Sequence, residues 1–274
     1  MLVDPGSIVM IRRPTLAARN RVFCASLQTR STLAVAPVAS VPCATLAPVP
    51  YTDEQLHALI DRCEPLRDVK APAGYRDSLA LCVVDSVQST GVTYSSVESV
   101  VGRYRAYRRE QAGDPNTDGV PELLTTFDEL SGPDGWAQRI GNRNRTSTHA
   151  GAPLKGAAIR DAALALTAEG INTAASLREA AEDAGRLACV EAAWRAVPGQ
   201  RSGITWHYVQ MLAGIPGVKP DRMICRFVAD ALGMPRRAVT TGFALRTLTA
   251  AAAEMGMSPT DLDHGVWQWQ RRQR

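Results

Sequence analysis

The chain has 274 residues, enough for one large domain or two small ones, and 45% of them are hydrophobic, which is ample for a buried core. Charged residues make up 21%, so wholesale disorder is not expected. No run reaches the roughly 18 apolar residues that a bilayer span needs, so no membrane association is expected. The six cysteines are scattered and form no Cys-x-x-Cys pair, which argues against a metal site or an iron–sulfur cluster. Free thiols in a reducing, cytoplasmic compartment are the simplest interpretation.

The net charge of +4 is concentrated near the N-terminus. Residues 1–50 hold five Arg and one acid, whereas residues 51–274 hold equal numbers of bases and acids. Any affinity for a polyanion must therefore come from local patches. One patch between Trp136 and Arg160 holds five bases and no acid, and it includes Arg143 and Arg145. A solvated loop and a phosphate site fit this patch equally well.

The first 50 residues differ from the remainder in composition. They are rich in Ala, Val, Pro, Ser and Arg, and prolines at positions 37, 42, 48 and 50 prevent a sustained helix. An Arg-rich, acid-poor start can mimic a transit peptide. A disordered extension, or a translation start placed too far upstream, is the preferred interpretation. We therefore predict that residues 1–50 lie outside the fold and that 51–274 form one domain.

From Thr52 onwards the sequence pattern is helical. The run Thr52-Asp-Glu-Gln55 has the form of a capping box, and apolar residues recur after it at helical spacing. No run alternates as a strand would, so we predict an all-α domain. Further helices are predicted at about 76–88, 94–111, 121–130, 154–169, 173–184, 186–197, 203–213, 221–232, 236–256 and 259–271.

Two of these helices flank the turn Val197-Pro-Gly-Gln-Arg-Ser-Gly203. Glycines let a backbone approach a ligand closely, and the following helix begins with free N–H groups at the positive end of its dipole. The turn is therefore a candidate seat for one phosphate. Many helical bundles have a similar turn and bind no DNA, so the spacing around it matters.

The intervals between the turn and the residues after it are similar to those of a known protein family. Gly199 is followed by Gly214-Ile-Pro216 and then by Asp221, with Arg226 five residues later. This layout resembles the DNA glycosylases of the helix-hairpin-helix, Gly/Pro-rich loop and aspartate (HhH-GPD) superfamily, particularly the endonuclease III-like branch. The likeness covers about residues 76–232 and extends more faintly to 271. It implies two helical subdomains flanking a cleft, with the hairpin at 197–203.

Two further matches lie upstream of the hairpin. Residues 85–90, Asp-Ser-Val-Gln-Ser-Thr, resemble the family's Ser-x-Gln-x-Thr signature, whose Gln reaches into the duplex near the flipped base. Residues 141–143 with Lys155 resemble the family's Gly-x-x-x-x-Lys-Ala helix opening. The DNA contacts expected from the likeness and from the basic patch are Gln88, Gly199, Gln200, Arg201, Gly203, Arg143 and Arg145.

The chain also departs from the family pattern. The usual His after the catalytic Asp is Met223, and the second hairpin glycine is replaced by Arg201, which alters the phosphate seat. Bifunctional members carry a Schiff-base lysine where this chain has Gly203. A lyase route through that amine is not expected, although Lys219 lies two residues before Asp221. No cofactor is implied, and a monovalent cation at the hairpin is left open.

Asp221 follows Pro220 and opens a predicted helix, and two roles fit it. An Asp at a helix start is routine and is worth about 1 kcal/mol. At the edge of a cleft it would stabilise the positive charge that builds on deoxyribose C1′ as a base departs, or deprotonate an attacking water. The resemblance favours the second role and makes Asp221 the catalytic residue.

Candidates for a base-binding pocket are Asp85, Trp206 and Tyr208. Asp85 lies on the helix that ends at Gln88, where it would read a Watson–Crick edge or lie on an exposed face. Aromatic residues after a hairpin can stack on a flipped base, but on such a helix they more often pack in the core. The pair Asp263-His264 resembles a catalytic pair, and a helix-start role for Asp263 is the simpler explanation.

These observations predict a monofunctional DNA glycosylase, a hydrolase that excises a damaged or modified base flipped out of duplex DNA. A monomer acting in the cytoplasm on the nucleoid is expected, and DNA repair and defence against modified foreign DNA fit equally well. A non-catalytic helix-hairpin-helix DNA-binding module and a helical protein-interaction domain are the alternatives. A deep cavity beside Asp221 would favour catalysis, whereas a cavity plugged by Trp206 or Met223 would favour binding alone.

Overall fold

The structure is a computed structural model that describes residues 51–273. The predicted extension, residues 1–50, lies outside the described residues. Within residues 51–273 the chain is helical, and apart from one isolated bridge between Arg145 and Leu154 it contains no β-structure. The all-α prediction is thus confirmed. None of the helices in this range has the length and apolar character needed to cross a membrane.

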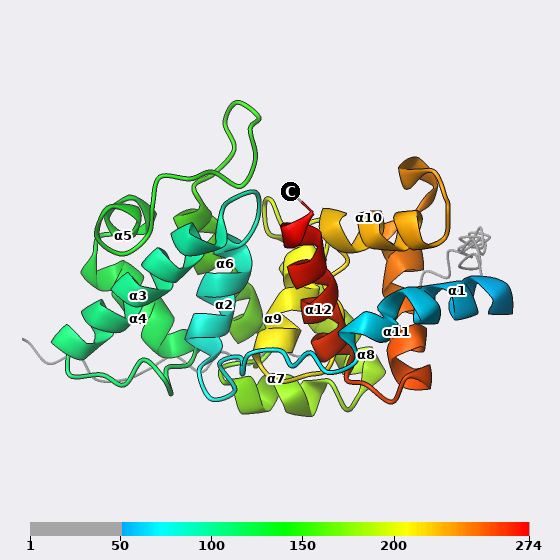
Figure 1. The fold of residues 1–274 in the computed structure, drawn as a ribbon. Helices are drawn as coiled ribbons and strands as arrows, with labels where there is room; N and C mark the ends of the chain where they lie inside the picture. The colour runs from blue at the N-terminus through cyan, green and yellow to red at the C-terminus, as the bar shows by residue number, and fades with distance from the viewer. Residues whose placement is uncertain (1–50, 274) are drawn as a thin grey trace, which may run out of the picture. The chain divides into compact units, whose positions relative to one another are not determined.

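Residues 51–273 form twelve α-helices and two short 3-10 helices, η1 and η2 (Figure 1). Their bounds are α1 Asp53–Cys63, η1 Glu64–Leu66, α2 Leu79–Gln88, α3 Tyr94–Glu110, α4 Val120–Glu129, α5 Pro133–Arg139, α6 Lys155–Ala168, α7 Ala174–Ala180, α8 Ala184–Ala196, α9 Ile204–Leu212, α10 Arg222–Ala231, η2 Arg236–Ala238, α11 Thr241–Glu254 and α12 Pro259–Arg272.

The predicted helices are present in the predicted order, with two differences. The capping box is confirmed, since Thr52 accepts a hydrogen bond from the Gln55 backbone and donates its own N–H to the Gln55 side chain. Helix α5 is not predicted because its seven residues are too short to show a hydrophobic period. The predicted helix over 236–256 is broken, because Thr240 caps α11 and leaves η2 as a separate turn.

The helices bury two separate hydrophobic cores. The first is built by α2 to α9, and every residue of α2 is buried within it. The second is built by α1, α10, α11 and α12, with α1 packed on α11 although the two are far apart in the sequence (Figure 1). The loop at 213–221 leads from the last helix of the first core to α10 of the second. This connection positions the candidate site.

Helix α12 corrects one prediction. The helix begins at Pro259 after the N-cap Ser258, so Asp263 lies in its second turn and not at its start. Asp263 is 8% exposed, and its Oδ1 accepts a 2.8 Å hydrogen bond from the backbone N–H of Lys219. Asp263 therefore ties α12 to the connection between the cores.

Candidate functional site

A cavity of about 950 Å³ is lined by residues from the helices of both cores. It collects three carboxyl groups and one amine. We call Asp85, Asp221 and Asp263 the three cavity carboxyls, and the amine is that of Lys219. Other lining residues used below are Tyr75, Ser89, Tyr94, Ile204, Tyr208, Arg222, Met223, His264, Trp267 and Arg271.

Asp221 is the N-cap of α10. Its Oδ1 accepts hydrogen bonds from the backbone N–H groups of Met223 and Ile224, at 2.7 and 3.3 Å. Ile204, the first residue of α9 after the 197–203 turn, lines the same cavity. The helix that follows the turn and the residue predicted as catalytic thus face one cavity.

Asp85 is the most deeply buried of the three cavity carboxyls, with 1% of its surface exposed. The Tyr75 hydroxyl donates a 2.8 Å hydrogen bond to its Oδ2, and its Oδ1 has no hydrogen-bond partner among the described residues. Burial raises the pKa of Asp85, and the hydroxyl of Tyr75, the amine of Lys219 and the hydroxyl of Tyr208 act in the opposite direction. The neutral acid is therefore favoured more strongly here than in water.

Lys219 holds its amine among the cavity carboxyls. Its Nζ donates a 3.1 Å hydrogen bond to Oγ of Ser89 and lies 3.9 Å from the centroid of the Tyr208 ring. Burial lowers the pKa of Lys219, and the three cavity carboxyls act in the opposite direction. Burial also raises the pKa of Asp263 to about 7. The cavity thus gathers ionisable groups whose environments differ.

Aromatic rings form part of the cavity wall. Tyr94 of α3 meets Trp267 of α12 edge to face, with 6.0 Å between ring centroids. His264 stacks on Trp267 at 5.6 Å, and the guanidinium of Arg271 lies 4.6 Å from the Trp267 centroid. Flat aromatic walls of this kind suit a planar ring. Sequence reasoning did not identify Tyr94 or Trp267 as cavity residues, because the pair meets only in the tertiary structure.

Of the two aromatic residues predicted for the pocket, only one lines the cavity. Tyr208 lines it, and burial raises its pKa strongly. Trp206, by contrast, is 1% exposed and packs in the first core with 5.9 Å between its centroid and that of Trp194. Its predicted place in the pocket is corrected: two positions along a helix turn a side chain to the opposite side. The cavity is accordingly not plugged by Trp206.

Gln88 is not among the cavity-lining residues either. It is 1% exposed, and its Oε1 accepts a 3.2 Å hydrogen bond from the Asn142 side chain. Beside it, Nζ of the buried Lys155 donates to the carbonyl oxygens of Gln88 and Thr90, at 2.8 and 2.6 Å. Burial lowers the pKa of Lys155 to about 8. Lys155 thus closes the C-terminal end of α2, and Gln88 reaches a duplex only if its side chain leaves the interior.

The 197–203 turn contains two glycines with left-handed backbone angles, φ +88° at Gly199 and +74° at Gly203. Arg201 is exposed on the turn, but Gln200 is 2% exposed and accepts a 2.5 Å hydrogen bond from Thr205. The side chain of Gln200 therefore serves the packing of the turn and does not face solvent. The backbone N–H of Gln200 also donates within the turn, to the carbonyl oxygen of Val197, so Gln200 offers no free donor to a phosphate in this arrangement.

The carbonyl oxygens of the turn take part in its own hydrogen bonds. The carbonyl oxygens of Val197 and Gln200 already accept hydrogen bonds from the N–H groups of Gln200 and Gly203. In residues 51–273 no cluster of three or more His, Cys, Asp or Glu side chains fits a metal ion. A monovalent cation at the turn stays a prediction.

The loop between α5 and α6 lies against the turn. A Cβ built on Gly199 would lie 2.5 Å from Cβ of Thr146, so only glycine fits there. Arg143 and Arg145 of the same loop are exposed, and the Arg145 guanidinium donates to the carbonyl oxygen of Ala152. The two arginines predicted to bind phosphate thus lie on a loop that contacts the candidate phosphate seat.

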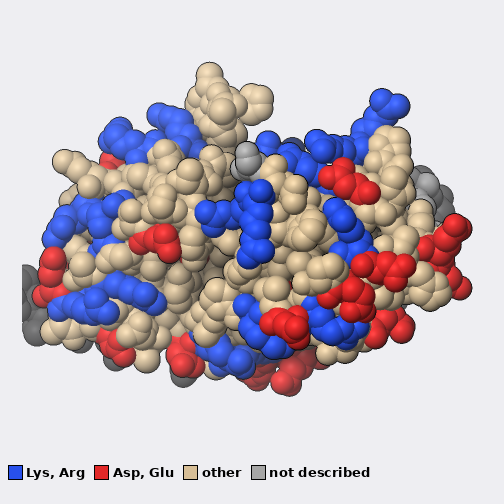
Figure 2. All heavy atoms as spheres, in the orientation of Figure 1, with Lys and Arg blue, Asp and Glu red and all other residues tan. Residues whose placement is uncertain are grey.

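Figure 2 shows Lys and Arg side chains gathered along the upper edge of one face, over α5, α10 and the C-terminal end of α12, whereas Asp and Glu gather over α1 and α11. The basic residues of these upper elements, η2 included, are Arg139, Arg222, Arg226, Arg236, Arg237, Arg271 and Arg272. Arg222 and Arg271 also line the cavity. Positive charge therefore extends to the residues around the three cavity carboxyls.

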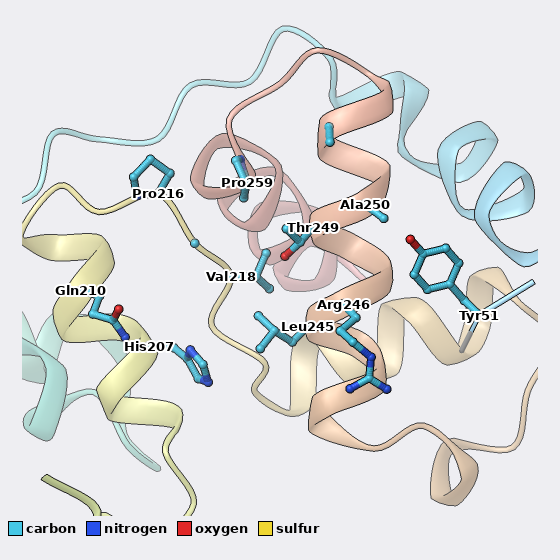
Figure 3. Close-up of a pocket in the computed structure, with 12 residues that line it drawn as sticks. Tyr51, His207, Gln210, Pro216, Val218, Leu245, Arg246, Thr249, Ala250 and Pro259 are labelled. Atoms are coloured by element: carbon cyan, nitrogen blue, oxygen red, sulfur yellow. The ribbon is translucent and has the colours of Figure 1, made fainter. Parts of the chain in front are cut away.

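A second cavity, of about 600 Å³, lies between α9 and α11 (Figure 3). His207 and Gln210 of α9 point toward it from one side, and Leu245 and Thr249 of α11 line it from the other. None of its described lining residues is an Asp or Glu. Because it lacks a carboxyl and most of its wall is apolar, the larger cavity is the better candidate for chemistry.

A family model described as a domain of unknown function (DUF8548) matches residues 54–271. The chain belongs to the DUF8548 family. No curated protein and no solved structure matches it. The DUF8548 match takes in both cores and all residues that line the larger cavity, so the candidate site is a feature of the DUF8548 domain itself.

Proposed function

We propose that this DUF8548 protein is a monofunctional DNA glycosylase of the HhH-GPD type. The observation that carries the proposal is the position of Asp221, which lines the same large cavity as the first residue of the helix after the hairpin-like turn. The cavity has aromatic walls and is bordered by arginines. A flipped nucleotide needs these features: a planar pocket, a nearby carboxylate and phosphate contacts outside.

Asp221 supplies the chemistry in this proposal. Both backbone hydrogen bonds to its carboxylate use Oδ1, which leaves Oδ2 for the substrate. As the C1′–N bond lengthens, positive charge develops on the sugar and the carboxylate stabilises it. Water then attacks C1′ and passes its proton to Asp221, so that the products are free base and an abasic sugar.

The same surface supports DNA binding. Arg201 on the turn, Arg222 at the start of α10 and Arg271 at the end of α12 offer positive charge at separate points around the cavity and the turn. Phosphate contacts of this kind position a duplex without reading its sequence, and they weaken as salt is raised. Affinity for plain duplex DNA should therefore fall steeply between low and physiological salt.

The decisive experiment is base release by Asp221→Asn. Asn is as good an N-cap as Asp, so the variant keeps the cap of α10 and removes only the charge. The full-length variant should bind duplex DNA that carries an abasic analogue, and should release no base from a panel of damaged and modified oligonucleotides. The matched control is Asp183→Asn at the N-cap of α8, where Asp183 accepts two backbone hydrogen bonds in the same way and does not line the cavity. Its release rate should equal that of the unsubstituted protein.

Base release by Asp221→Asn at the unsubstituted rate would show that the assignment is wrong. A non-catalytic DNA-binding module is the second candidate, favoured by Met223 in place of the family's His and by the loop that contacts the turn at Gly199. It predicts salt-dependent DNA binding with no base released from any member of the panel. Absence of any salt-dependent shift with duplex DNA would remove both candidates.

A further inference from the structure

The carboxyl of Asp85 has an oxygen without a partner inside a cavity. Asp85 lines the larger cavity, is 1% exposed, and has no hydrogen bond to Oδ1. Leaving a buried polar atom without a partner is costly, so such atoms in native proteins call for an explanation. A bound molecule in the cavity can supply the missing partner.

Asp85 and Asp221 lie in opposite environments around the same cavity. Asp221 is half-buried at the N-terminus of α10, where its Oδ1 accepts two backbone N–H groups. Asp85 lies in the interior, where burial favours the protonated form. Two carboxyls held in contrasting environments are a general arrangement for an acid and an anion acting in one reaction.

The groups around Asp85 come from several elements. Tyr75, in the loop before α2, holds Oδ2 with its hydroxyl and lies under the guanidinium of Arg105 at 5.4 Å. The other titratable groups coupled to Asp85 are Cys82 of α2, Glu98 and Tyr94 of α3, Tyr208 of α9 and Lys219 before α10. The Tyr75 hydroxyl holds Oδ2, whereas Oδ1 is buried without a hydrogen-bond partner and is the oxygen that we expect a ligand to meet.

We propose that Asp85 is the general acid of the glycosylase reaction and that the cavity takes purine bases, neutral ones being protonated by Asp85 on a ring nitrogen as they leave. This inference rests on the proposed function. It adds a residue that touches the base, whereas Asp221 acts at the sugar.

The step is balanced without any further reagent. The C1′–N bond breaks and its electron pair goes to the base, while the carboxyl proton of Asp85 moves to the ring nitrogen. Water adds to C1′ and gives its proton to Asp221. The Asp85 carboxylate takes up a proton from solvent when the products leave, and Asp221 releases one. The net reaction consumes one water molecule.

The chemistry of the acid separates purines from thymine and uracil, and the size of the base separates them from cytosine, whose ring N3 is also basic. A carboxylic O–H needs a basic lone pair, and a neutral purine offers unprotonated ring nitrogens in addition to its exocyclic groups, whereas thymine and uracil offer carbonyl oxygens. The walls formed by Tyr94, Tyr208 and Trp267 present ring faces on which a bicyclic base can stack. A purine already methylated at N7 is cationic and needs no acid to depart.

The difference in charge between a neutral purine and an N7-methylated purine provides the test. Single-turnover release is measured with full-length protein on duplexes that carry one hypoxanthine or one 7-methylguanine. Asp85→Asn should lose about 100-fold or more on hypoxanthine and stay within about threefold on 7-methylguanine, since general acids contribute about 10²–10⁴-fold. The control is Asp118→Asn, a buried carboxyl that accepts a tyrosine hydroxyl, from Tyr104 at 2.9 Å, pairs in addition with Arg108, and does not line the cavity. It should leave the ratio of the two rates unchanged.

Tyr75→Phe provides a second readout if Asp85→Asn fails to fold. It removes the hydrogen bond to Oδ2 but keeps the acid, so hypoxanthine release should persist to higher pH than in the unsubstituted protein. Each of three results would overturn the inference but leave the proposed base release intact. They are equal losses of rate on both bases with Asp85→Asn, an unchanged pH profile with Tyr75→Phe, and release confined to pyrimidines. Release of no base at all by the unsubstituted protein would reject the proposed function and this inference together.

Discussion

Oδ1 of Asp263 in α12 accepts a 2.8 Å hydrogen bond from the backbone N–H of Lys219, just before α10. The bond ties two elements of the second core at the point where they border the cavity. Burial raises the pKa of Asp263 to about 7, whereas an unfolded Asp titrates near 4. Between these values the folded protein holds a proton that the unfolded chain lacks.

Stability should therefore fall as pH rises from about 4 to 7 on account of this group, and the contribution of the bound proton is lost above pH 7. Asp263→Asn keeps an acceptor oxygen and removes the titration. Relative to the unsubstituted protein, its free energy of unfolding in urea should gain about 3 kcal/mol between pH 5 and pH 8. An equal pH dependence in both proteins would contradict this prediction.

The matched control is Asp261→Asn, two residues away in the first turn of α12. Partial burial raises the pKa of Asp261, but hydrogen bonds from the Ala71 backbone and the Lys70 ammonium outweigh it, and the net shift is downward. The Asp261 carboxylate stabilises the fold at pH values above the pKa near 4 of an unfolded Asp. This contribution is lost as pH falls through the pKa of Asp261 in the folded protein. Asp261→Asn should therefore lower stability at neutral pH, the opposite sign to Asp263→Asn.

Lys155 should make stability rise in alkali. Its folded pKa of about 8 lies below the value near 10.4 of an unfolded lysine, so between these limits the unfolded chain binds the extra proton. The unfolding free energy of the unsubstituted protein should include a gain of about 2 kcal/mol from pH 8 to pH 10 that Lys155→Met lacks. Lys70 is exposed, so Lys70→Met should keep this gain in unfolding free energy. If Lys70→Met also lost the gain, the effect would not come from Lys155.

Lys219 tests the monofunctional assignment. The full sequence has three lysines, at 70, 155 and 219, and only Lys219 lines the cavity. Burial lowers the pKa of Lys219, but its Nζ is engaged by Ser89 and by the Tyr208 ring, so we expect no attack on an abasic aldehyde. Borohydride treatment with abasic duplex DNA should give no covalent adduct on a denaturing gel. An adduct that disappears in Lys219→Met would instead identify Lys219 as a Schiff-base nucleophile.

Gly199→Ala should disturb the hairpin turn. The residue has φ +88°, and its added Cβ would lie 2.5 Å from Cβ of Thr146. The backbone strain alone costs about 1–3 kcal/mol, and the clash adds to it or displaces the loop. Thr146→Gly in the same chain removes the clash but not the strain, so urea unfolding should recover part of the loss. Full additivity of the two substitutions would show that the loop does not contact the turn.

Much of the helical organisation can be read from local signals. The Thr52 capping box and the Asp221 helix start follow from hydrogen bonds within a few residues, and the helical periods follow from the apolar side of each helix. These signals involve residues within one or two helical turns, so they can be recognised from the sequence alone. Helix α5 escaped prediction because seven residues show too little of a period.

The identity of the cavity residues depends on packing between distant segments. Whether Asp85 faces solvent, core or cavity depends on how α3, α9 and the connection before α10 pack around α2, and no local pattern records this. Packing also separates two residues that are two positions apart on α9: Trp206 lies in the first core, whereas Tyr208 lines the cavity. Local hydrogen bonds and periodicity fix where helices begin and end, whereas the environment that sets each carboxyl's charge arises only when both cores have assembled.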